Sequence, residues 1–215
     1  MLTIGSAIEI LAYGVLRQQA ISLEEGHRGD VGFDAAVLFF GDFSETGTVG
    51  PRTLESIARI SQLFASDLVP NVVCVGGARP QLGIFGSELA AKELEQRGVP
   101  AASLFCDDRF SFDSTSNVEQ ALRVINSHHW KRIAVVASPF HIVRLRYLLD
   151  LAADRSTETP ERLTIVFLPS VEFESEGWTT KARVADLQHE MMAWVALSLL
   201  PRDYYQRFLS YLRKS

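Results

Sequence analysis

The sequence is poor in cysteine: it has only Cys74 and Cys106, and neither stands in a CxxC motif or near a histidine at metal-ligand spacing. Both lie in apolar, strand-like runs, which favours two buried, reduced thiols. A disulfide between them is the alternative. Because no other part of the sequence has the ligand spacing of a zinc site, no metal is expected.

Positive charge is not in excess, since 21 Lys and Arg residues stand against 26 Asp and Glu residues and give a formal net charge of -5. Basic residues are locally enriched only at Arg207, Arg213 and Lys214. Proteins that bind nucleic acids usually carry a basic face, so DNA and RNA are not expected partners.

Long hydrophobic runs are missing as well, because none approaches the roughly 18 apolar residues that cross a bilayer. Glu9 interrupts the first apolar stretch, no Lys- or Arg-rich segment precedes it, and no A-x-A site follows. A signal peptide is therefore not expected. The sequence predicts a cytoplasmic protein without a transmembrane segment.

The sequence does contain short apolar runs that alternate with amphipathic segments. The runs are typical of strands buried on both faces, and the segments are typical of helices. The predicted strands are 35–41, 71–77, 102–106, 132–138 and 163–169, and the predicted helices are 3–21, 51–66, 86–97, 113–127, 139–153 and 180–200. This order predicts an α/β fold, Rossmann-like, with three α/β/α layers, a mainly parallel five-stranded sheet, and additional N-terminal and C-terminal helices.

The chain divides into one main part and two short ends. The main domain is predicted at 34–200, and residues 1–33 are expected to form a helix and a polar loop packed on it. Pro201 ends the last long helix, and 201–215 is expected to form a short helix rich in aromatic residues. Its aromatic stripe fits core packing, a homodimer contact, or a partner or membrane surface.

Ligands of such sheets bind outside the carboxyl ends of the strands. At the end of the fourth strand, "SPFHIVR" places Ser138 before a helix, with His141 and Arg144 one turn apart on one face. A helix start beside an arginine suits a phosphate or carboxylate, and the helix dipole favours a neutral His141. A simple cap with a packed histidine is the alternative.

Glycines end the second strand in "VGG", where Gly76 and Gly77 let a ligand approach the backbone, and Glu88 opens the next helix. The pattern is neither a Walker A motif nor GxGxxG. A flexible loop, with Ser87 as the helix cap, is an equally good interpretation.

Gly41 and Asp42 end the first strand, and Arg52 stands at the start of the next helix. Asp42 and Arg52 could hold a polar ligand or pair with each other. Because an arginine is unfavourable at a helix N-terminus, an anionic partner for Arg52 is the favoured interpretation.

The stretch "SFDSTSNVEQ" crowds polar residues before an amphipathic helix. Ser116 and Glu119 have the spacing of a capping box, while Asp113 or Ser114 could cap one turn earlier. One cap needs only one such residue, so the surplus indicates that some side chains face a ligand. The candidates in this stretch are Ser111, Asp113, Ser114 and Asn117.

Together these four strand-end motifs resemble the DUF218 family of YdcF-like proteins, which include SanA and ElyC. The matching positions are Gly41, Arg52, Gly76, Gly77, Glu88, Ser111, Asp113, Ser114, Asn117, Ser138, His141 and Arg144. Asp42, Val75 and Ser116 depart from the family pattern, and at the aligned position of Ser114 a serine replaces the usual threonine. Ser116 replaces a glutamate whose role Glu119 could partly take. Without a transmembrane anchor, the chain is similar to the soluble YdcF type.

The resemblance implies a Rossmann-like fold, a polar cleft at the carboxyl ends of the strands, and S-adenosylmethionine as a candidate ligand. From the residues, the first hypothesis is a transferase or hydrolase for a phosphorylated or nucleotide-like small molecule, with His141, Asp113 and Glu88 as candidate catalytic residues. Arg52, Arg144 and the helix start at Ser138 would hold the anion. The alternatives are a non-catalytic module that binds S-adenosylmethionine or a nucleotide, and a methyltransferase.

Overall fold

The computed structural model describes residues 32–106, 113–153, 163–171, 187–188 and 190–195. The predicted helix at 3–21, Ser111, the aromatic helix at 201–215 and most of the predicted helix at 180–200 lie outside these ranges. Within the described residues, no helix has both the length and the apolar character needed to cross a membrane.

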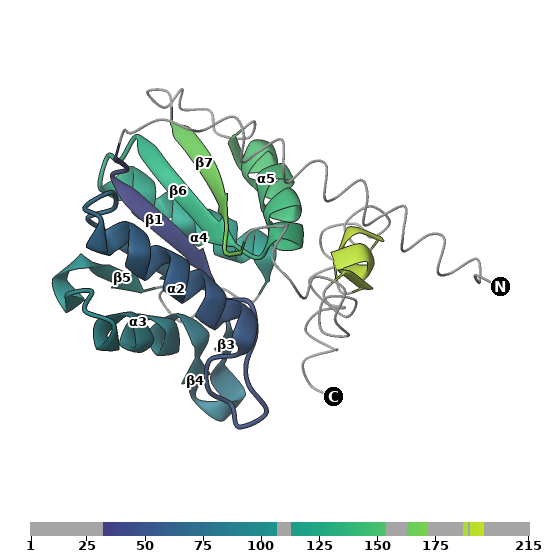
Figure 1. Cartoon of the computed structure of the whole chain (residues 1–215). Helices are drawn as coiled ribbons and strands as arrows, with labels where there is room; N and C mark the ends of the chain where they lie inside the picture. The colour runs from purple at the N-terminus through teal and green to yellow at the C-terminus, as the bar shows by residue number, and fades with distance from the viewer. Residues whose placement is uncertain (1–31, 107–112, 154–162, 172–186, 189, 196–215) are drawn as a thin grey trace.

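A five-stranded sheet forms the centre of the fold (Figure 1). Its strands are β1 (Ala35–Phe39), β2 (Val72–Val75), β5 (Leu104–Cys106), β6 (Arg132–Ala137) and β7 (Thr164–Pro169). They lie in the order β5-β2-β1-β6-β7, and every neighbouring pair is parallel. The predicted Rossmann-like fold class is confirmed.

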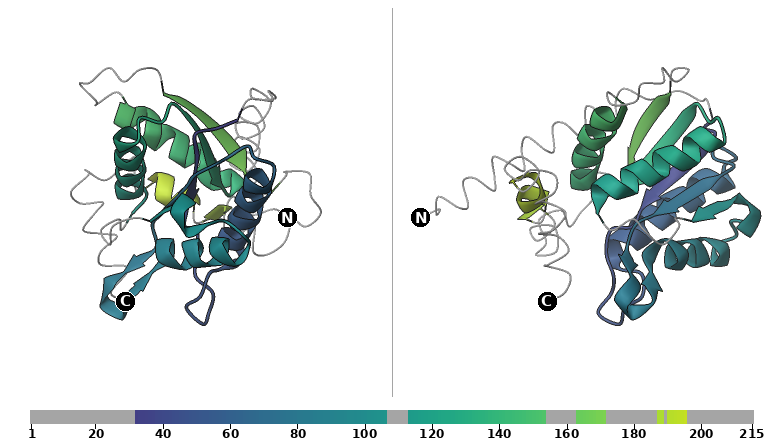
Figure 2. Two further views of the ribbon diagram at one scale, coloured as in Figure 1. Left: turned by 90° about the vertical axis from the view of Figure 1, so that its left-hand side faces the viewer. Right: turned by 180° about the vertical axis from the view of Figure 1, so that it is seen from behind.

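Among the described residues, two helices lie on each face of the sheet, which gives three layers (Figure 2). On one face lie α2 (Pro51–Ala65) and α3 (Gly86–Gln96), and on the other lie α4 (Ser114–Ser127) and α5 (Pro139–Ala153). The strand order explains why α2 and α3 lie on one face and α4 and α5 on the other. The chain moves outward from β1 through β2 to β5 and then returns across the sheet to β6.

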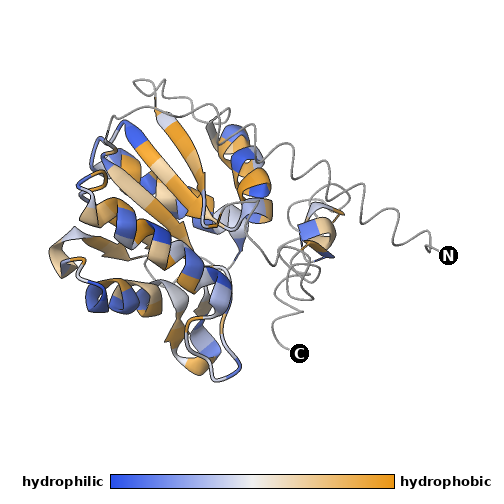
Figure 3. Ribbon diagram, viewed as in Figure 1, coloured by the Kyte–Doolittle hydropathy of each residue, from blue (hydrophilic) through white to orange (hydrophobic). Residues whose placement is uncertain are grey.

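Alternating residues of the strands supply the two cores. Val37 and Phe39 pack with α4 and α5, whereas Ala36 and Leu38 pack with α2 and α3. Every residue of β1 is buried, as expected for a strand with helices on both faces. The hydropathy colouring shows orange strands inside and blue positions along the helices (Figure 3).

The second connection holds an element that the sequence pattern did not predict. A short antiparallel hairpin, β3 (Ala78–Arg79) and β4 (Ile84–Phe85), encloses the 3-10 turn η1 (Pro80–Leu82) between β2 and α3. Its base is closed by hydrogen bonds from Gly86 N to Gly77 O and from Ser87 N to Gly76 O, each 3.0 Å. Figure 1 shows the hairpin beyond the carboxyl end of the sheet.

The two thiols differ from the prediction of two buried cysteines. Cys74 is fully buried, whereas Cys106, its register partner on β5, is exposed because β5 is an edge strand and ends there. Cys74 and Cys106 are not joined by a disulfide bond. A further 3-10 turn, η2 (Ala101–Ser103), precedes β5 and shortens the strand predicted at 102–106.

Candidate functional site

A cavity of about 700 Å³ opens at the carboxyl end of the sheet. Its walls come from the residues after β1, the turn after β2, the hairpin, the first turns of α2, α4 and α5, and Glu190. The predicted site residues that line it are Gly41, Asp42, Arg52, Gly77, Asp113, Ser114, Asn117, Ser138, His141 and Arg144. Four strand-end motifs thus meet in one place.

Two other predicted residues lie outside the cavity wall. Glu88 is exposed in the first turn of α3, so the structure does not bring its carboxylate to the cavity. Gly76 lies behind the wall, against the side chain of Asn117. Ser87 is not the helix cap, because α3 begins at Gly86 with Phe85 in the N-cap position.

The paired glycines of "VGG" permit two close contacts. Gly76 has φ +94°, and a Cβ there would lie 2.6 Å from Nδ2 of Asn117. Gly77 has φ +74°, and a Cβ there would lie 2.5 Å from the ring of Phe40 and 2.9 Å from Cα of Gly86. Residues with a side chain rarely adopt such backbone angles. Glycine is therefore favoured at both positions, by the positive φ and by the lack of room for a Cβ. The turn thereby holds α4 against the end of β2.

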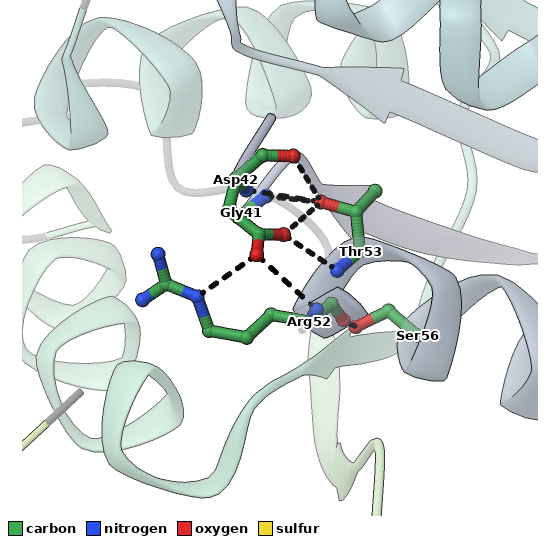
Figure 4. A network of polar contacts seen from close by, with 5 residues as sticks. All are labelled: Gly41, Asp42, Arg52, Thr53 and Ser56. Atoms are coloured by element: carbon green, nitrogen blue, oxygen red, sulfur yellow. Dashed lines mark hydrogen bonds and ion pairs between the residues drawn. The ribbon is translucent and has the colours of Figure 1, made fainter. Parts of the chain in front are cut away.

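Asp42 stabilises the start of α2 from outside the helix (Figure 4). The N-cap position is Gly50, which has no side chain to cap the helix. Instead, the Asp42 carboxylate accepts hydrogen bonds from Thr53 N at 3.0 Å and Arg52 N at 3.4 Å. Gly50 is needed there, because a Cβ would lie 2.5 Å from Cγ of Asp42.

Asp42 also pairs with the side chain of Arg52, whose Nε lies 3.5 Å from Oδ2. Of the two alternatives for Asp42 and Arg52, the structure therefore contains the pair. Thr53, which the sequence did not single out, fixes the loop by accepting hydrogen bonds from the backbone N–H groups of Gly41 and Asp42, each at 3.0 Å. The acidic group that offsets an arginine at this helix start is Asp42 itself.

Asp113 caps α4, and this corrects the capping box predicted at Ser116 and Glu119. Its Oδ1 accepts hydrogen bonds from Thr115 N at 2.8 Å and Ser116 N at 2.9 Å, while Asp113 N donates to Oγ of Ser116 at 3.0 Å. Ser116 thus takes the N3 role that Glu or Gln plays in a capping box. Glu119 is exposed on the outer side of α4, where it lines a separate, smaller cavity.

Arg144 lies in a buried cluster with Ser114 and Glu190. Its Nε and Nη2 donate to the two carboxylate oxygens of Glu190 at 2.6 and 2.8 Å, and its Nη1 donates to Oγ of Ser114. Both charged side chains are 5% exposed. The Glu190 carboxylate therefore balances the charge of Arg144 inside the cavity wall, and the guanidinium fixes the hydroxyl at the start of α4.

Sequence reasoning missed Glu190, although a weak signal exists. The residue is helical and lies three positions after Leu187, and both are buried. An acidic residue on the apolar face of a helix needs a partner when it is buried. Its partner Arg144 lies 46 positions away, and no short-range pattern connects the two.

His141 and Asn117 present functional groups of a different kind. His141 is 8% exposed, lines the cavity, and meets the Phe39 ring edge-on at a centroid distance of 6.2 Å. Asn117 is 7% exposed, and its Oδ1 accepts no hydrogen bond from the described residues. Because a buried polar atom without a partner is costly, this oxygen is suited to accept a hydrogen bond from a ligand.

Arg79 is a further cavity residue that the sequence did not single out. It is exposed on the hairpin, with its guanidinium carbon 4.1 Å from the centroid of the Phe43 ring. Among the described residues, Arg79 is the cavity-lining arginine that forms no ion pair. Its position in "GGARP", just after the glycine turn, was the available signal.

Metal chemistry has no cluster to support it in the part of the chain that the structure describes, where no group of three or more His, Cys, Asp or Glu residues could hold an ion. The cavity offers arginines, carboxylates, one histidine, the amides of Asn117 and Gln81, and three serine hydroxyl groups. Comparison of the chain with known protein families, with curated proteins and with solved structures finds no match.

Proposed function

We propose that the cavity binds a phosphorylated or nucleotide-like small molecule, and that the protein is a transferase or hydrolase with His141 as general acid or base. One observation carries the proposal. In the part of the chain that the structure describes, three helices begin at the cavity, and aspartates occupy two of those starts: Asp42 at α2 and Asp113 at α4. The first turn of α5 has no acidic residue, and Ser138 and His141 line the cavity there.

The start of α5 is suited to an anion because the helix dipole places partial positive charge at that end. A phosphate at this position would lie in the same turn as His141, which could then transfer a proton to or from the reacting group. Asn117 would accept a hydrogen bond from a hydroxyl or amino group of the ligand. The ligand would therefore carry at least one anionic group and one donor.

The buried arginine has a supporting part in this proposal. Because Glu190 balances Arg144 and Asp42 pairs with Arg52, these two cations contribute less net charge than the sequence suggested. Arg144 instead holds Ser114 at the start of α4, where its hydroxyl would border the proposed anion site. Because Oδ1 of Asp113 already accepts the two hydrogen bonds of the helix cap, His141 remains the strongest candidate for proton transfer.

The proposal is tested with a thermal-shift panel of nucleotides and sugar phosphates, followed by mass spectrometry of products for any ligand that binds. A ligand at 100 times its Kd stabilises the protein by about 2.7 kcal/mol. His141→Ala should lower turnover by roughly 10²- to 10⁴-fold, the usual contribution of a general acid or base. His129→Ala, at an exposed position in the turn before β6, is the control. It should change neither the thermal shift caused by the ligand nor the turnover.

If no ligand of the panel shifts the melting temperature, or if His141→Ala and Arg144→Ala leave both binding and turnover unchanged, the proposal is wrong. Membership of the DUF218 family is likewise a proposal, supported by the meeting of nine of its twelve matching residues at one cavity.

One observation favours a second candidate, a non-catalytic module that binds a nucleotide or S-adenosylmethionine. Of the three candidate catalytic residues, Glu88 lies outside the cavity and Asp113 caps a helix, which leaves His141. Tight binding by calorimetry without any product by mass spectrometry would support the module. Transfer of a methyl group from S-adenosylmethionine would identify a methyltransferase instead.

A further inference from the structure

The hairpin end of the cavity differs in chemistry from the helix-start end. At the helix starts the lining is polar, with Asn117, Ser138 and His141. At the hairpin the lining includes Phe43, Arg79 and Leu82. A ligand that fills the cavity therefore meets hydrogen-bonding groups at one end and flat or apolar surfaces at the other.

Arg79 and Phe43 form a stacked pair at the hairpin end. The guanidinium carbon of Arg79 lies 4.1 Å from the Phe43 centroid, and Phe43 in turn packs on Phe40 at a centroid distance of 4.6 Å. A guanidinium is planar and has two faces, and one of them lies on Phe43. Arg79 is exposed and lines the cavity, so its guanidinium is within reach of a ligand, and the second face is the one that a planar group would contact.

The surroundings of Arg79 favour a ring over a second phosphate. Leu82, at the end of η1, is 61% exposed and also lines the cavity, so the same hairpin supplies an apolar side chain. Gln81 lies between them in sequence and offers an amide that can donate and accept hydrogen bonds. A guanidinium stacked on an aromatic ring, with an apolar neighbour and an amide, suits a flat heteroaromatic group.

We infer that the hairpin end binds a nucleobase stacked on Arg79, so that the ligand is a nucleotide rather than a sugar phosphate. This rests on the proposed function for the placement of the phosphate at α5. The cavity volume of about 700 Å³ lies within the range of about 300–1,000 Å³ typical of small-molecule sites. Stacking tolerates any base, so Gln81 would be the residue that discriminates between bases.

Calorimetry with three probes tests the inference: AMP, ribose 5-phosphate and adenosine. AMP should bind the wild-type protein about 5- to 150-fold more tightly than ribose 5-phosphate, which corresponds to the usual stacking contribution of one base. Arg79→Lys keeps the positive charge but removes the planar group. It should abolish most of this preference while leaving the affinity for ribose 5-phosphate unchanged within about twofold.

Arg97→Lys is the matched control, since Arg97 pairs with Glu93 on the exposed side of α3, away from the cavity. Equal affinities of the wild-type protein for AMP and ribose 5-phosphate would overturn the inference and leave the proposed function standing. An unchanged AMP preference in Arg79→Lys would also overturn it. A third outcome is that the wild-type protein binds adenosine but neither AMP nor ribose 5-phosphate, and that Arg79→Lys loses adenosine binding. This outcome would support the nucleobase site and contradict the proposed function.

Discussion

At the scale of single residues, most charged groups around the cavity already serve the fold. Asp42 holds the start of α2, Asp113 caps α4, and Glu190 balances Arg144. A group that is fixed by its own hydrogen bonds can still contact a ligand, but its orientation is set beforehand. The site is therefore preorganised, which reduces the entropy lost when a ligand binds.

The turn after β2 gives a sharp test of this preorganisation. Gly77→Ala should destabilise the protein by about 2–5 kcal/mol. The alanine must keep the backbone angle φ +74°, and its methyl group overlaps the Phe40 ring and Cα of Gly86. Gly83→Ala is the matched control, with φ +66° but nothing within 4 Å of its Cβ, and should cost about 1 kcal/mol. Urea unfolding measures both values, and equal losses would show that crowding at Gly77 has no effect.

At the scale of elements, the neighbouring strands β2 and β5 give the two cysteines different reactivities. Burial raises the pKa of the Cys74 thiol well above its usual range, and the nearby Cys106 raises it further. The thiolate is the reactive form, so Cys74 should be inert in the folded protein. Cys106 is exposed at the end of β5 and should react.

Iodoacetamide at pH 8 should therefore modify one thiol per folded chain, at Cys106, and two after denaturation. Cys106→Ser should leave no reactive thiol in the folded protein, and mass spectrometry of peptides locates the label. Stability should also fall as pH rises above about 8.5, because the thiol of Cys74 ionises more readily in the unfolded chain. Rapid labelling of Cys74 without denaturant would contradict the expectation.

The sequence predicted the long elements well, because their burial leaves a pattern. A strand with helices on both faces needs a continuous apolar run, and α2 to α5 each need an apolar stripe. The hairpin β3–β4 has two residues per strand, which is too short for any periodicity, so the sequence predicts only a loop there. The hairpin carries Arg79, and for that reason the nucleobase end of the cavity could not be predicted.

The candidate site was predicted in position but not in its pairings. Strand ends locate Asp42, Asp113, His141 and Arg144 at one edge, because parallel strands all finish there. Sequence alone could not decide whether Asp113 or Ser116 caps α4, since both suit the N-cap position. It could not reveal Glu190 as the partner of Arg144, since that contact depends on the path of the chain in space.

At the scale of the whole molecule, the buried pair of Arg144 and Glu190 joins α5 to the helical residues 190–195. Arg144→Met leaves Glu190 buried without its cation and should cost about 3–5 kcal/mol of unfolding free energy. Arg144→Met combined with Glu190→Leu should cost less than either single change, because no buried charge remains. Urea unfolding of the wild type, Arg144→Met, Glu190→Leu and the double variant gives the coupling energy between the two side chains.

The exposed pair of Arg97 and Glu93 is the control for this cycle. Its two side chains are 37% and 28% exposed, against 5% for each partner of the buried pair. Its coupling energy should be only about 0.2–1 kcal/mol. Equal coupling in the two pairs would show that residues 190–195 do not hold Glu190 against Arg144 in solution.

The strand order also has a consequence for synthesis on the ribosome. β1 pairs with β2 early, but its other edge waits for β6, which begins at Arg132. At a translation rate of about 5–20 residues per second, the roughly 90 intervening residues take about 5–20 s to emerge. During that interval the nascent chain carries a wholly apolar strand with one unpaired edge, so the central strand of the finished protein is prone to aggregation while the chain is being made.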